Sequence, residues 1–167
     1  MLIKAYGQLW NPHIIDWGSR GAGNKGKLIG EVLRQKKWHD IDFWEARGIY
    51  VLHSDFRAIY VGQILSDALG KRIRDHFTDR FAGRWDMFSW FSVAAPRFSR
   101  NDVSAPGKRT VAAKTVVDSL EALSILIADP SLNRKRESLE GAFVAFQPKK
   151  ANPKAVRAYL EEILKKL

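Results

Sequence analysis

Two β-prone runs joined by a short polar turn constrain the fold of this chain more than any other feature. The runs are Gly48–His53 and Ala58–Gly62, and Ser54-Asp55-Phe56-Arg57 separates them. A connection of this length and chemistry is typical of a β-hairpin. Tyr50 and Tyr60 are an even number of positions apart, so their side chains project from one face of the hairpin if no bulge intervenes. The sequence therefore predicts two phenols that meet on one face of a sheet.

Hydrophobic periodicity and stop signals predict the other elements. Asp86–Val93 is rich in aromatic residues and indicates a third strand. Gly18–Lys27 and Ala94–Lys108 combine glycine or proline with basic residues, which is typical of cationic loops. We expect helices over four segments: Lys27–Lys37, Leu69–Phe77, Val111–Ala128 and a C-terminal helix that begins at Asn152-Pro153.

The charge balance indicates a polyanionic partner. The chain has 28 Lys and Arg residues against 18 Asp and Glu residues, which gives a net charge of +10. This charge is spread as +3 over residues 1–47, +3 over residues 48–147 and +4 over residues 148–167. Nucleic acid is the first candidate partner, and an anionic membrane surface is the second.

The composition also excludes several kinds of chemistry. The chain contains no cysteine, so disulfides, thiolate metal sites, iron–sulfur clusters and cysteine nucleophiles are excluded. No signal-peptide pattern precedes Trp17, and the longest strongly apolar run, Leu123–Ala128, is far too short to span a membrane. We therefore expect a cytoplasmic protein.

Polar residues follow the hairpin at spacings that group them on two predicted helices. Arg72 and His76 are four positions apart in the helix after the hairpin, so they share one side of it. Glu121 lies in the longest predicted helix, and Pro130 and Asn133 follow it at nine and twelve positions. A phenol pair, an arginine, a histidine and a carboxylate are thus available for one site.

With these residues in place, the chain resembles the GIY-YIG nucleases. Each matching element is weak alone, but five of them in the right order and spacing form a specific pattern. The resemblance covers residues 48 to about 134. Its elements are GIY (48–50), YVG (60–62), Leu69-Gly-Lys-Arg72 with His76, Leu120-Glu121, and Pro130 with Asn133.

The resemblance implies an α+β fold, with a small three-stranded antiparallel sheet flanked by helices. The flanking patterns add helical appendages at both ends of the chain. We accordingly expect three parts: a basic extension with a Gly-rich loop and a helix over 1–47, a nuclease-like domain over 48–147, and a basic amphipathic helix over 148–167.

The resemblance also implies the reaction, which is hydrolysis of nucleic-acid phosphodiester bonds with a divalent metal, usually Mg²⁺, for which Mn²⁺ is a possible substitute. Glu121 matches the metal-binding carboxylate, and Arg72 matches the arginine that holds the scissile phosphate. A planar, permanently charged guanidinium suits that role. His76 occupies a position where members carry His or Tyr. The remaining matches are Tyr50 and Tyr60, one of which helps to activate water, and Gly48, Gly62 and Asn133, which support the site structurally.

Two features of the match leave the mechanism open. The interval from Gly62 to Arg72 is two residues longer than in the commonest form of the family, which makes Arg74 a competitor for the arginine role. A tyrosine with a pKa of about 10 is a poor base at neutral pH. Tyr50, His76 and a metal-bound hydroxide therefore all remain candidates for activating the nucleophile.

Double-stranded DNA is the partner that these features favour. We expect no membrane partner, and a homodimer is possible. Two alternatives remain: a non-catalytic nucleic-acid-binding or complex-assembly module on the same fold, and a nuclease acting on RNA or single-stranded DNA. The basic residues predicted to contact nucleic acid are Lys25, Lys27, Lys71, Arg74, Arg97, Arg100, Lys108 and Arg109.

Overall fold

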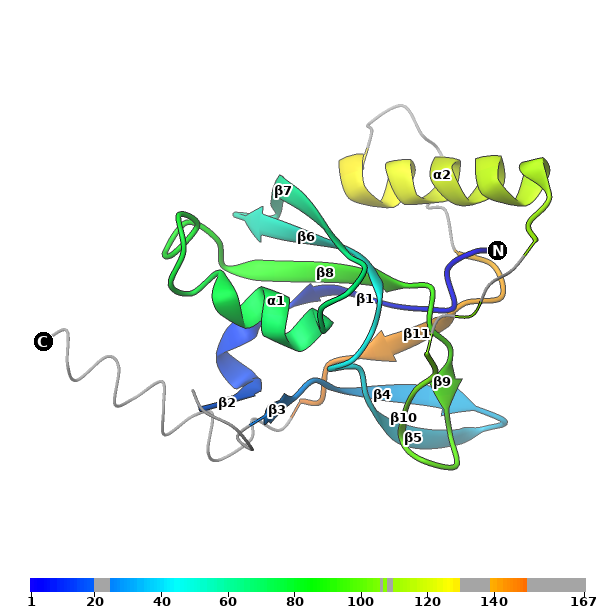
Figure 1. The fold of residues 1–167 in the computed structure, drawn as a ribbon, viewed down its shortest axis with the longest axis horizontal. Coiled ribbons are helices and arrows are strands. Elements are labelled where there is room, and N and C mark those ends of the chain that lie inside the picture. The colour runs from blue at the N-terminus through cyan, green and yellow to red at the C-terminus, as the bar shows by residue number, and fades with distance from the viewer. Residues whose placement is uncertain (20–24, 106, 108–109, 130–138, 150–167) are drawn as a thin grey trace, which may run out of the picture.

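A mixed sheet of seven strands, in the order β5-β4-β11-β1-β8-β6-β7, is the centre of the computed structural model (Figure 1). The structure describes residues 1–19, 25–105, 107, 110–129 and 139–149. β1 and β11 are parallel, and the other neighbouring pairs are antiparallel. The strands are β1 (Ala5–Trp10), β4 (Ile29–Arg34), β5 (Lys37–Asp42), β6 (Gly48–Ser54), β7 (Arg57–Ile64), β8 (Met87–Ser92) and β11 (Phe143–Phe146).

Smaller elements surround this sheet. Two short hairpins, β2–β3 and β9–β10, form separate two-stranded sheets. The described residues form two α-helices and one 3₁₀ turn. The bounds are β2 (Asp16–Gly18), β3 (Lys25–Lys27), β9 (Pro96–Arg97), β10 (Asp102–Val103), η1 (Pro12–Ile14), α1 (Leu69–Asp75) and α2 (Ala113–Ala128).

The predicted three-stranded antiparallel sheet flanked by helices is wrong, because the fold is mainly β. The hairpin β6–β7 and strand β8 are present, but β1 pairs with the free side of β8 and extends the sheet. β11 then pairs with β1, and the hairpin β4–β5 pairs with β11. Residues 1–47 therefore supply three of the seven strands rather than a helical appendage.

The predicted helix over Lys27–Lys37 is the clearest error in local structure. Its residues form β4 and the start of β5, with Gln35 and Lys36 as the two turn residues. Both turn residues have positive φ, of 49° and 63°. This geometry suits a tight hairpin, but it is rare outside glycine and asparagine, so the sequence gives little sign of it.

Several other predictions are confirmed by the structure. The hairpin forms with Asp55 and Phe56 at its turn, and α1 and α2 lie inside the ranges predicted for helices. The expected loop Ala94–Lys108 contains the small hairpin β9–β10. The predicted C-terminal helix lies almost wholly outside the described residues. No helix in the described part of the chain is long and apolar enough to cross a membrane.

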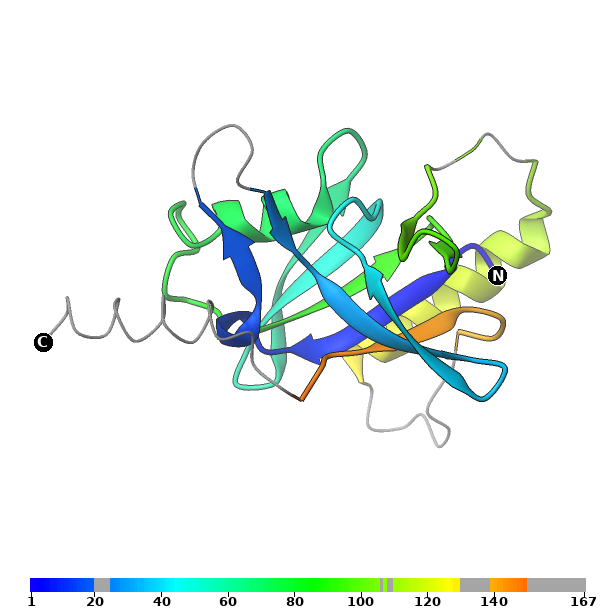
Figure 2. The same cartoon turned by 90° about the horizontal axis from the view of Figure 1, so that it is seen from below.

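The two α-helices cover opposite faces of the sheet, and Figure 1 shows them well apart. Because successive residues of a strand point to opposite faces, Tyr50 and Val51 enter different core clusters. Tyr50 packs in the larger cluster with Ile73 of α1, whereas Val51 packs in the smaller cluster with Ala122 of α2. Figure 2 gives the same arrangement from below.

The paired residues Val51 and Val61 test how much this second cluster contributes to stability. They lie opposite each other on β6 and β7, but Val51 is fully buried and Val61 is 51% exposed. We expect Val51→Ala to lower the free energy of unfolding by about 2 kcal/mol, because it removes two buried methyl groups and leaves a cavity. Val61→Ala, measured by the same urea titration, changes it by less than about 0.5 kcal/mol. Equal effects at the two positions would contradict the burial of Val51 and the exposure of Val61.

Candidate active site

The two motif tyrosines lie on the same face of the sheet, as predicted. Tyr50 on β6 is paired with Gly62, and Tyr60 on β7 is paired with Leu52, so the two phenols are diagonal neighbours. Their ring centroids are 6.0 Å apart. The register of the hairpin shifts between Leu52 and His53, where β7 has one extra residue, Ile59. Without this bulge the two-residue turn would pair Tyr50 with Val61 and put the two phenols on opposite faces. The bulge, and not the even spacing, therefore brings them to one face.

The glycines of the two motifs have steric reasons to be glycine. A Cβ at Gly62 would overlap the phenol of Tyr50, which lies directly across the strand pair. Gly48 has a φ of +151°, and a Cβ there would overlap the carbonyl oxygen of Phe91. Gly62 therefore allows close approach of the Tyr50 phenol, and Gly48 allows close approach of β6 and β8.

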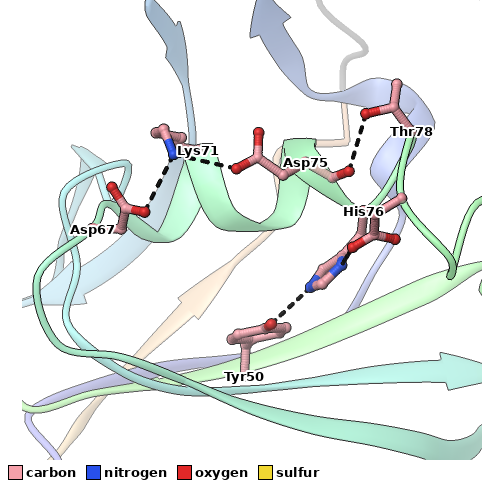
Figure 3. A network of polar contacts seen from close by, with 7 residues as sticks. Tyr50, Asp67, Lys71, Asp75, His76 and Thr78 are labelled. Carbon is pink, nitrogen blue, oxygen red and sulfur yellow. Dashed lines mark hydrogen bonds and ion pairs between the residues drawn. The ribbon is translucent and has the colours of Figure 1, made fainter.

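His76 joins the end of α1 to the sheet through Tyr50. The Tyr50 hydroxyl lies 2.7 Å from Nε2 of His76, and both side chains are almost completely buried (Figure 3). The indole N–H of Trp85 donates to the His76 carbonyl, which fixes the backbone at the helix end. His76 thus belongs to the site, where the sequence pattern places it.

Asp79 completes this polar chain, and sequence reasoning missed it. Its Oδ2 lies 2.6 Å from Nδ1 of His76, and its Oδ1 accepts from the backbone N–H of Phe81. Burial raises the pKa of Asp79, but the hydrogen bonds from Phe81 and His76 outweigh it and hold that pKa below its ordinary value. The only sequence signal was an acidic residue three positions after the motif histidine.

Arg72 contacts the same phenols from α1. Its interactions with the nearby Tyr50 and Tyr60 phenols raise the pKa of its guanidinium. Burial raises the pKa of Tyr50 to about 12, although the nearby Arg72 acts in the opposite direction. Tyr50 is therefore a neutral phenol at physiological pH. Arg72 and Tyr60 are both partly exposed, so they are the members of the cluster that solvent reaches.

Glu121 is not brought to this cluster. It is exposed on α2, and the adjacent Ala122 packs against Val51 and Phe91 on the opposite face of the sheet from Tyr50. Ser119 and Ala122 mark the buried side of this helix, whereas Leu120 is 58% exposed.

Within the described residues, no group of three or more histidine and acidic side chains is arranged to hold a metal ion. Asn133, which was expected to support the site, lies outside the described residues. The carboxylate that the resemblance assigns to Mg²⁺, Glu121, is carried by α2, whose Ala122 packs on the face of the sheet opposite Tyr50.

Four of the basic residues predicted to contact nucleic acid have partners within the chain. Lys27 and Arg100 are exposed, and Lys108 and Arg109 lie outside the described residues. Ion pairing reduces the positive charge that Lys25, Lys71 and Arg97 offer to a ligand. Lys25 pairs with Glu45, Lys71 with Asp67 and Asp75, and Arg97 with Asp102, while Arg74 donates to the Trp17 carbonyl and lies over the ring of Trp44.

Other basic residues near the cluster were missed. Arg80 follows Asp79 directly, is exposed, and has its guanidinium 4.8 Å from the ring centroid of Phe81. Phe81 in turn packs on Tyr60, with ring centroids 4.5 Å apart. The turn after α1 thus adds a cation to the rim of the site beside Arg72.

Comparison of the chain with protein-family models, curated proteins and solved structures found no match.

The raised pKa of Tyr50 predicts a loss of stability at alkaline pH. The unfolded phenol ionises near pH 10 and the folded one near pH 12. The contribution of Tyr50 is therefore fully present below pH 10 and is lost as the pH rises through 12. Between pH 9 and 11 we expect a decrease of about 1.4 kcal/mol in the free energy of unfolding from this residue. Urea titrations should show that Tyr50→Phe loses correspondingly less over the same interval; an identical decrease would contradict the burial of this hydroxyl.

Proposed function

We propose that the protein is a nuclease that hydrolyses phosphodiester bonds of nucleic acid at the cluster of Arg72, Tyr60, Tyr50 and His76. The observation that carries this proposal is the position of Arg72, which lies beside the buried Tyr50 phenol and remains partly exposed. A guanidinium in this position is preorganised to bind a phosphate and to stabilise the charge that develops on it.

The roles of the two tyrosines differ in this proposal. Tyr50 is fully buried and holds its proton at neutral pH, so it positions Arg72 and His76 rather than removing a proton from water. Tyr60 is partly exposed beside Arg72, so it is the phenol that contacts the substrate. Charge neutralisation by Arg72 is one of the two requirements of phosphodiester hydrolysis, and an activated water is the other.

Double-stranded DNA is the proposed substrate. The net charge of +10 favours a polyanion, and Arg80 and Lys27 are exposed cations in the described part of the chain. Charge of this kind contributes to backbone binding without sequence preference. It gives no reason to prefer one base sequence over another.

A second candidate is a nucleic-acid-binding module without catalytic activity. The observation that favours it is the position of Glu121 on the far face of the sheet, together with the lack of a metal-binding group among the described residues. Such a module would bind DNA through Arg72 and its neighbours without cleaving it.

Replacing Arg72 tests the proposed reaction. We expect Arg72→Ala to lower kcat/KM for plasmid cleavage by about 100-fold or more, because one preorganised charge at the phosphate is removed. Lys71→Ala is the matched control: it removes a neighbouring cation of the same helix that is already paired with Asp67 and Asp75. The control should cleave within about threefold of the unsubstituted protein. Equal rates for the two variants would contradict the role of Arg72.

The same assay decides between the two candidate functions and tests the metal. The nuclease proposal expects cleavage by the unsubstituted protein that EDTA stops and added Mg²⁺ or Mn²⁺ restores. Binding without cleavage at any metal concentration would favour the non-catalytic module. If Glu121→Gln abolishes the restoration by Mg²⁺, then Glu121 supplies a metal ligand; unchanged restoration would remove Glu121 from the site.

A further inference from the structure

The hydrogen bonds around His76 form a chain with a definite direction. Asp79 is an acceptor only, because its carboxyl group is ionised at neutral pH, and its Oδ2 faces Nδ1 of His76 at 2.6 Å. The ring proton of neutral His76 must then lie on Nδ1. Nε2 is left as an acceptor, so the Tyr50 hydroxyl at 2.7 Å donates to it. Arg72 has donors only, so it cannot accept the Tyr50 proton in place of His76.

The orientation of the Asp79 carboxylate is itself fixed. Its second oxygen, Oδ1, accepts the backbone N–H of Phe81 at 2.8 Å. This local turn holds Oδ2 toward His76. Its donor is a backbone N–H, which no side-chain rotation can move. Asp79 is 37% exposed on its side chain, whereas His76 is 1% exposed, so the carboxylate lies at the solvent end of a buried chain.

No other described residue is seen to fix the tautomer of His76. The aromatic rings of Tyr60 and Phe81 pack against the imidazole, and Trp85 donates to the His76 carbonyl rather than to the ring. Tyr50 contacts Nε2, and Asp79 contacts Nδ1. If the ring proton moved to Nε2, it would point at the Tyr50 oxygen. The Tyr50 hydroxyl would then have neither His76 nor Arg72 as an acceptor.

We propose that Asp79 is the positioning residue of this site, and that it sets the tautomer of His76 and thereby the direction of the hydrogen bond that holds Tyr50 in place beside Arg72. The assignment of the tautomer stands on the geometry alone. Its effect on cleavage rests on the proposed nuclease function. A carboxylate that fixes a histidine tautomer is a recurring device in hydrolytic sites, and replacing it with an amide removes the preference while keeping the shape.

The tautomer is measured directly by long-range ¹H–¹⁵N correlation spectra of the histidine ring nitrogens, recorded at a pH where the rings are neutral. His76→Gln identifies the His76 signals among those of the four histidines. We expect the proton on Nδ1 in the unsubstituted protein and on Nε2, or shared between the two nitrogens, in Asp79→Asn. Asp75→Asn is the matched control, because Asp75 lies one turn away and pairs with Lys71 instead. A proton on Nε2 in the unsubstituted protein, or an unchanged Asp79→Asn spectrum, would overturn the proposal.

Steady-state kinetics then measure the consequence for cleavage. We expect Asp79→Asn to lower kcat at least about tenfold while KM changes by less than about threefold, since the phosphate-binding guanidinium is present but less well fixed. Asp75→Asn should retain both constants. If the tautomer changes and kcat does not, the effect of Asp79 on cleavage is refuted. If the unsubstituted protein does not cleave at all, the proposed function fails while the spectra still decide the tautomer.

Discussion

The contact between the Tyr50 hydroxyl and His76 is the interaction on which the site depends. It is made in the buried layer between β6 and the end of α1, where both groups are inaccessible to solvent. A buried phenol and a buried imidazole must satisfy each other, because neither can turn to water. The contact thus fixes how α1 lies on the sheet, and with it the position of Arg72. The absence of a side chain at Gly62 makes room for the phenol that forms it.

The part of this arrangement that local sequence specifies could be predicted. The turn after His53 predicted the hairpin, and the structure confirms both the hairpin and the position of the two phenols on one face. The reason differs from the prediction, because a bulge at Ile59, which the sequence does not mark, sets the face of Tyr60. The spacing of Arg72 and His76 placed them on one side of the helix after the hairpin, and this prediction depends only on residues that are close in the chain.

The rest of the fold depends on pairings that the sequence does not mark. Val32 and Leu33 fit an amphipathic helix as well as a strand, and the choice was decided by pairing with Ala145 and Trp38. β11 lies between β1 and β4, although more than 130 residues separate it from β1. The position of Glu121 was missed for the same reason, because the face of the sheet that α2 covers is set by contacts between residues far apart in the sequence. Asp79 was missed because a single carboxylate in a polar turn is an ordinary surface residue.

The central proposal is that nucleic acid binds at Arg72, on the side of the sheet that α1 covers. Its most direct test is an NMR titration of the protein with a short DNA duplex, following the arginine side-chain Nε–H signals and the backbone amides. The account predicts that the signals of Arg72, and the amides around Tyr60 and Arg80, shift together in proportion to bound DNA. Shifts confined to α2 around Glu121, with those of Arg72 unchanged, would contradict it.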